Sequence, residues 1–154
     1  LDPRSYRGLI LSNGLRVLLA SDPKTADSAA SMTVQVGYLS DPVGFPGLAH
    51  FCEHMLFLGS KQFPKEGDFK SVVASGGGSD NAFTAIDETN YYFDVEGSLL
   101  KPALARFAGF FTGPLFTASA TSREVNAIDS EHSKNLQSDF WRYGQLLKLW
   151  ANQS

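Results

Sequence analysis

The sequence has little of what several classes of protein require. Its 154 residues include one cysteine, Cys52, which excludes a disulfide-stabilised scaffold. No uninterrupted apolar run approaches the roughly 18–20 residues of a membrane-spanning helix, so we expect no membrane insertion. The 13 basic residues are outnumbered by 16 acidic ones, whereas a nucleic-acid-binding surface needs a clustered basic face. We therefore expect no nucleic-acid partner.

The residues that are present are typical of a globular domain. Hydrophobic residues make up 43% of the chain and include 12 phenylalanines, too much apolar material for a disordered segment. No repeat or linker divides the sequence, so residues 1–154 are expected to form one domain. The chain starts at Leu1 and ends within a helical pattern, so we expect it to be a piece of a longer protein. The missing secretory leader and the cysteine count favour a cytoplasmic location.

The order of the expected elements indicates an α+β fold. A hairpin is expected around Ser12-Asn13-Gly14, because Asn-Gly between β-prone runs is a strong turn signal. The expected strands cover residues 6–11, 15–20, 30–36, 81–86 and 89–95. The expected helices cover residues 47–58, 65–74, 98–111 and 119–154, the last with a break near Ser138, and residues 75–79 form a flexible or tightly turned segment. This order predicts an antiparallel or mixed sheet packed against helices.

A metal-binding pattern lies in the first expected helix. His50 and His54 are four positions apart, so on a helix both imidazoles share one face and can reach the same ion. Glu53 borders that face, where a carboxylate can take a proton from metal-activated water. The order H-x-x-E-H is the inverse of the commoner H-E-x-x-H zinc helix. The pattern predicts a catalytic zinc site.

A third protein ligand is needed to complete such a site. The candidates lie in the acidic part of the last helical stretch: Glu124, Asp129, Glu131 and His132. Glu124 and Glu131 are seven residues apart, two helical turns, so they lie on nearly the same face. One of them could bind the metal while the other orients a ligand. The pattern of residues does not choose among the four candidates.

The sequence resembles a known family over essentially its whole length. Residues 47–59, Gly-Leu-Ala-His-Phe-Cys-Glu-His-Met-Leu-Phe-Leu-Gly, are similar to the signature of the inverted-motif zinc metallopeptidases of the insulysin and pitrilysin type. The resemblance continues in residues 6–9, 81–84, 89–95 and 123–127, in the same order. It implies that the chain is the incomplete first domain of the pitrilysin-type fold and the zinc-binding part of a metalloendopeptidase.

The resemblance also implies roles for individual residues. One zinc ion per chain would be held by His50, His54 and Glu131, with Glu53 as the general base. Glu124 would match an acid that orients a ligand without binding the metal. A strand at residues 79–84 would pair with the peptide substrate, which makes Asn81, Ala82 and Phe83 substrate-contact candidates. Cys52 would be a buried neighbour of the site.

Members of this family are large proteins of four homologous domains that enclose a chamber. The resemblance therefore implies short, unstructured peptides as substrates and the remaining domains of the same protein as partners. It also implies that this piece is inactive alone. We expect apolar surface in residues 103–116 and in the last helix to favour self-association of the isolated chain.

Two other functions deserve comparison with this interpretation. A metal-dependent ribosylhomocysteine lyase shares the H-x-x-E-H order, but its third ligand is a downstream cysteine, and Cys52 lies inside the motif. A zinc- or peptide-binding homologue without catalysis is the second alternative. Such members usually lack one of the histidines or the base, whereas His50, Glu53, His54 and Glu131 are all present here.

Overall fold

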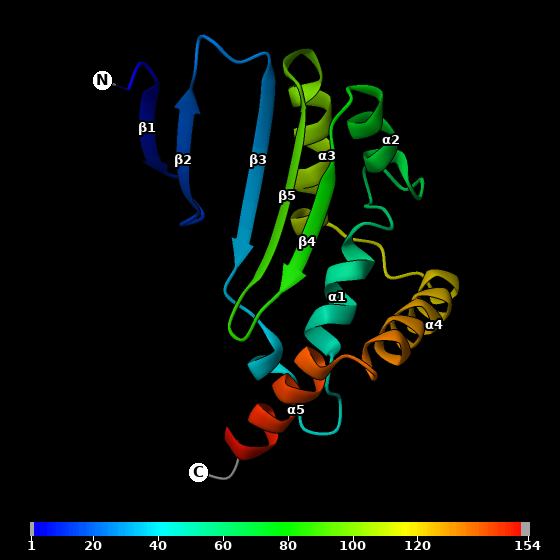
Figure 1. The fold of residues 1–154 in the computed structure, drawn as a ribbon. Helices are drawn as coiled ribbons and strands as arrows, with labels where there is room; N and C mark the ends of the chain where they lie inside the picture. The colour runs from blue at the N-terminus through cyan, green and yellow to red at the C-terminus, as the bar shows by residue number, and fades with distance from the viewer. Residues whose placement is uncertain (1, 152–154) are drawn as a thin grey trace.

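The computed structural model describes residues 2–151 and has the expected α+β architecture (Figure 1). A two-stranded sheet pairs β1 (Ser5–Ile10) with β2 (Arg16–Ser21). A three-stranded sheet has the order β3 (Asp27–Val34), β5 (Thr89–Glu96) and β4 (Asp80–Thr84). Every strand pair in this part of the chain is antiparallel, so the sheet is not of the mixed kind.

The helices follow the expected order, with shifted ends. The 3₁₀ turns are η1 (Tyr38–Ser40) and η2 (Gly97–Leu99), and the first two α-helices are α1 (Leu48–Leu56) and α2 (Asp68–Ser75). The other helices are α3 (Leu100–Thr112), α4 (Ala118–Asn135) and α5 (Asp139–Ala151), so the predicted break near Ser138 is confirmed. Within residues 2–151, none of these helices combines the length and apolar character needed to cross a membrane.

The predicted hairpin at Ser12-Asn13-Gly14 is confirmed. Leu11 N donates to Leu15 O at 2.9 Å, and Gly14 occupies a positive φ of 85° that side chains disfavour. The strand predicted for residues 30–36 is displaced toward the N-terminus and ends at Val34. Val36 is consequently outside the strand and exposed, whereas Met32 and Val34 alternate inward as expected. Pairing with β5 sets these limits, because the register ends at Val34 opposite Thr89.

The core lies between the inner face of the three-stranded sheet and helices α2 and α3. Figure 1 shows α3 running behind this sheet. Phenylalanine rings meet there edge to face, with centroids 5.5 Å apart for Phe69 and Phe93 and 5.0 Å apart for Phe69 and Phe110. The buried cluster comprises Leu56, Phe69, Val73, Tyr91, Phe93, Val95, Ala103, Phe107 and Phe110. Much of the apolar surface of residues 103–116 is therefore internal, although Leu104 and Phe116 remain exposed.

The glycine-rich segment before β4 is tightly turned rather than open. A Cβ atom at Gly78 would lie 1.9 Å from the carbonyl oxygen of Asp94, well inside van der Waals contact. Ser79 Oγ donates to Asp94 Oδ1 at 2.6 Å, and Asp94 N donates to Ser79 O at 2.9 Å. These contacts fix the start of β4 against β5.

Replacement of Gly78 by alanine should destabilise the fold, because the new methyl group must displace the backbone of β5. We expect the free energy of unfolding to fall by roughly 1–3 kcal/mol in urea denaturation. Gly8→Ala in β1 is the matched control, since no atom lies within 4 Å of the position that its methyl group would take, and its effect should be small. Equal stability of the two variants would contradict this packing.

Candidate metal centre

Helix α1 places two imidazole nitrogens side by side. His50 Nε2 and His54 Nε2 are 3.1 Å apart, and the two rings meet edge to face with centroids 4.6 Å apart. The four-residue spacing produces this arrangement, because residues one turn apart share a helix face. Both side chains are partly exposed. The pair therefore offers two nitrogen ligands to an ion on one side of the helix.

Helix α4 packs beside α1 and brings a carboxylate to this pair. Glu131 Oε2 lies 3.9 Å from His50 Nε2 and 3.7 Å from His54 Nε2. Ligand atoms around a tetrahedral ion with bonds of about 2.0–2.1 Å are roughly 3.3 Å apart. The three observed separations of 3.1, 3.7 and 3.9 Å bracket that value. The three atoms thus form an open triangle of suitable size for one metal ion.

Glu124 reaches the same helix from one side. Its Oε1 lies 2.7 Å from His54 Nδ1, and the carboxylate is largely shielded from solvent. A carboxylate at this distance favours the tautomer in which Nδ1–H donates, which leaves the lone pair of Nε2 free for an ion. By helical geometry Asp129 and His132 lie about 140° and about 80° around α4 from Glu124. Both are exposed.

Glu53 lies on the same helix and is directed into the protein. It is only 7% exposed, and its Oε2 accepts a hydrogen bond of 2.5 Å from Thr84 Oγ1. The ligand atoms of His50, Glu53 and His54 all lie within 4.8 Å of one another. A carboxylate therefore stands beside the nitrogen pair, with its orientation set by a hydroxyl of β4. The hydrogen bond between Thr84 and Glu53 could not be predicted from the sequence pattern.

The donor set fits zinc. Two imidazole nitrogens with one carboxylate oxygen are typical of catalytic zinc sites, which keep a fourth position open. Calcium and magnesium prefer sites made of oxygen ligands alone.

Asp41 holds the N-terminus of α1. The N-cap position, Gly47, has no side chain to accept the free N–H groups, and Asp41 accepts instead from Gly47 N at 2.7 Å and Ala49 N at 2.8 Å. Its negative charge also complements the positive end of the helix dipole. Sequence reasoning missed this residue, because a helix cap is normally adjacent to the helix and Asp41 is several residues away.

The candidate substrate segment lies in β4, at the edge of the sheet. Backbone bonds join Asp94 N to Ser79 O and Ala85 N to Glu88 O at the two ends of the β4–β5 pairing. Antiparallel pairing alternates, so the backbone groups of Asp80, Ala82 and Thr84 face away from β5. Within residues 2–151 no strand pairs with that side of β4. This edge is therefore open to an added strand.

The side chains of the candidate segment point to both faces of β4. Ala82 is partly buried, whereas Asn81 and Phe83 are exposed, the latter by 47%. Phe83 is consequently not a core residue. Asn81 Oδ1 accepts a hydrogen bond of 2.9 Å from Ala82 N, one of the groups at the open edge.

The prediction that Cys52 is buried is wrong. Its side chain is exposed on α1, because the face of the helix that packs on the core carries Glu53, Met55 and Leu56. Partial desolvation by its surroundings still raises the pKa of the Cys52 thiol. Burial likewise raises the pKa of Tyr91, with the nearby Cys52 and Glu53 adding to the effect.

Burial also raises the pKa of the Asp80 carboxyl in β4. The Lys70 ammonium, 4.0 Å away, opposes this shift.

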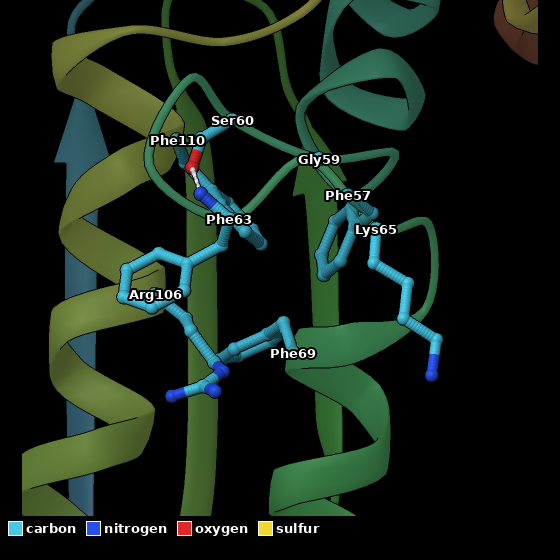
Figure 2. Close-up of a pocket in the computed structure, with 8 residues that line it drawn as sticks. All are labelled: Phe57, Gly59, Ser60, Phe63, Lys65, Phe69, Arg106 and Phe110. Carbon is cyan, nitrogen blue, oxygen red and sulfur yellow. Dashed lines mark hydrogen bonds between the residues drawn. The ribbon is translucent and has the colours of Figure 1, made fainter.

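A small pocket shown in Figure 2 is a packing feature and not a second site. Arg106 lies against it with its guanidinium carbon 4.5 Å from the centre of the Phe63 ring. Its Nε donates to Asp68 Oδ2 at 2.7 Å and its Nη1 to Pro102 O at 3.0 Å. These contacts occupy the guanidinium and join α2 to α3.

The family model and the similar proteins point to the same family. The chain matches the insulinase family, peptidase family M16, over residues 16–152. It is 56% identical over 151 residues to insulin-degrading enzyme of Mus musculus, and 54% identical over 147 residues to insulin-degrading enzyme-like 1, peroxisomal, of Arabidopsis thaliana. These alignments cover 98% and 96% of the chain, and 15% of each relative.

The fold is similar to a solved structure of this group. The crystal structure of pitrilysin superposes with a TM-score of 0.90 at 38% sequence identity, over 94% of this chain and 16% of that one. The chain thus spans about 15% of the length of the curated relatives it matches.

Removal of the Asp41 carboxylate should loosen the start of α1, because two backbone N–H groups lose their acceptor. We expect Asp41→Ala to lower the free energy of unfolding by about 1–2 kcal/mol in urea denaturation. Asp87→Ala removes the same charge from an exposed turn and serves as the control. An Asp41 variant as stable as the Asp87 variant would show that the cap contributes nothing.

Proposed function

The chain belongs to the insulinase family of peptidases, family M16, and we propose that it forms the zinc-binding part of a metalloendopeptidase. The observation that carries the proposal is the cluster of His50 Nε2, His54 Nε2 and Glu131 Oε2, within 3.9 Å of one another beside the carboxylate of Glu53. One zinc ion per chain would be held by these three side chains.

When bound, zinc supplies a Lewis acid that lowers the pKa of water to about 7 and polarises a peptide carbonyl. Glu53 would act as general base, taking a proton from the attacking water and delivering it to the leaving amine. Its Oε2 is engaged by Thr84, so Oε1 is the oxygen available to hold the proton. Glu124 would keep His54 in the tautomer that presents Nε2 to the metal.

The substrates we propose are short, unstructured peptides bound in extended form. The open edge of β4 offers the carbonyl of Ala82 and the backbone groups of Thr84, while the Ala82 N–H is held by Asn81 Oδ1. Pairing through the backbone tolerates many side-chain sequences. Asn81 and Phe83 are exposed on the neighbouring face and would contact the peptide side chains. An unstructured peptide is required, because a folded one has its backbone already paired.

Complete catalysis would need the rest of a longer protein. The matched relatives are more than six times as long as this chain, since it covers 15% of their length. We propose that other domains supply groups that orient the peptide, and that these 154 residues alone cleave little.

Helix α5 exposes a large apolar surface. Its exposed apolar side chains are Phe140, Trp141, Tyr143, Leu146, Leu147, Leu149 and Trp150. Such a surface is normally covered by a neighbour, so we propose self-association of the isolated chain. A cytoplasmic location of the longer protein stays a prediction from the sequence, and one relative is named as peroxisomal.

Replacement of Glu53 by glutamine tests the proposed general base. In the longer protein, Glu53→Gln should retain stoichiometric zinc and lower kcat for a fluorogenic peptide by about 10²–10⁴-fold, because an amide cannot accept the proton. Zinc is measured by elemental analysis and cleavage by fluorescence. Wild-type rates in the variant would refute the mechanism, and zinc without hydrolysis in the wild type would favour the non-catalytic alternative.

Zinc affinity tests the ligand assignment. Glu124→Ala should weaken binding by about 10–100-fold, because His54 loses the carboxylate that orients it. Glu131→Ala should weaken binding more, since a ligand is removed. His132→Ala, an exposed neighbour on α4, should bind zinc as the wild type does. Competition with a chromophoric chelator measures all three, and unchanged affinity in Glu131→Ala would rule out its role as a ligand.

A further inference from the structure

Thr84 connects the open edge strand to the buried carboxylate of the metal-binding helix. It is the last residue of β4, and its hydroxyl lies 2.5 Å from Glu53 Oε2. An ionised carboxylate only accepts hydrogen bonds, so the proton must come from Thr84. The contact holds one of the two carboxylate oxygens of Glu53, Oε2.

A second threonine, Thr89, lies next to Thr84. Thr89 faces Thr84 across the β4–β5 pair and is 4% exposed. Its Oγ1 donates to Val36 O at 2.8 Å and lies 3.5 Å from Thr84 Oγ1. Because Thr84 gives its proton to Glu53, its oxygen faces Thr89 only as an acceptor. Both hydroxyl protons are thus used elsewhere, so no hydrogen bond joins the two threonines, and Thr89 is a buried packing neighbour of Thr84.

The end of the β4–β5 hairpin is hydrogen-bonded to the segment that follows β3. Tyr38 N donates to Ala85 O and Leu39 N to Ile86 O, each at 3.0 Å. The contact is so close that a Cβ atom at Gly37 would lie 2.4 Å from Ala85 O. The same connection carries Asp41, which holds the N-terminus of α1. The same connection therefore joins the hairpin that carries Thr84 to the helix that carries Glu53.

We propose that Thr84 is a positioning residue. Its hydroxyl selects the side-chain conformation in which the carboxylate of Glu53 lies beside the histidine pair. The proposal rests on the function proposed above, because it assigns Glu53 as the general base. It also links peptide binding to that base. The backbone of Thr84 faces the open edge, so a peptide paired there would contact the residue that holds Glu53.

The test compares Thr84→Val, which keeps the shape and removes the hydroxyl, with Thr84→Ser, which keeps the hydroxyl. In the longer protein, Thr84→Val should lower kcat for a fluorogenic peptide by about 10–100-fold, with KM and zinc content unchanged. Thr84→Ser should recover most of this loss. Thr112→Val removes an exposed hydroxyl of α3 and should keep wild-type kinetics. A serine variant as slow as the valine variant, or a valine variant with wild-type kcat, would overturn the proposal.

A double-mutant cycle separates positioning from general damage. In a Glu53→Gln background the residual rate should not fall further when Thr84→Val is added, because the oriented carboxylate is already absent. A further loss equal to that seen in the wild-type background would overturn the proposal. Thr84→Ala carries the same expectations and serves if Thr84→Val does not fold.

A crystal structure of the Thr84→Val variant tests positioning without any activity. Glu53 should leave its wild-type conformation or occupy two conformations, whereas in Thr84→Ser it should stay in place. An unmoved Glu53 in Thr84→Val would overturn the proposal. If instead the wild-type protein shows no zinc-dependent cleavage, or Glu53→Gln remains active, the proposed function fails while this structural comparison still decides the role of Thr84.

Discussion

The site depends on the placement of one short helix. Helix α1 has nine residues, and a helix of that length is not stable alone in water. Its position is therefore set by tertiary contacts: Asp41 at its N-terminus and Met55 and Leu56 in the interior. With the helix fixed, the histidine pair faces α4 and Glu53 faces β4. One element thus presents two candidate metal ligands on one side and a buried carboxylate on another.

Two other elements, α4 and β4, complete the arrangement. Helix α4 contributes acidic side chains two turns apart, so that Glu124 and Glu131 approach the histidines together. Strand β4 contributes a hydroxyl to Glu53 and an edge that no strand of residues 2–151 pairs with. A single geometry therefore combines a candidate ion site, a candidate base and a surface that could align an extended chain. Leu56 of α1 and Ala82 of β4 pack in or against the phenylalanine-rich core, and α4 is positioned by its packing against α1.

Sequence patterns predict those features that depend on residues close together in the chain. The four-residue spacing of His50 and His54 predicts their shared face, and Asn13-Gly14 predicts the first hairpin. The residues alone leave the third ligand open among four candidates, and the resemblance selects Glu131. Contacts between distant segments have no local signal. Asp41 and Thr84 were missed for this reason, and the exposed side of α1 that carries Cys52 depends on how the helix packs.

X-ray absorption spectroscopy of the zinc-loaded longer protein tests the central claim most directly, because it reports the atoms bound to the ion. We predict nitrogen and oxygen neighbours at about 2.0–2.2 Å, with the multiple-scattering signature of two imidazoles. The spectrum of a Glu131→Ala variant should lose one light-atom neighbour from the protein. A sulfur neighbour at about 2.3 Å, which would bring Cys52 into the coordination sphere, or a single imidazole would contradict the proposed ligand set.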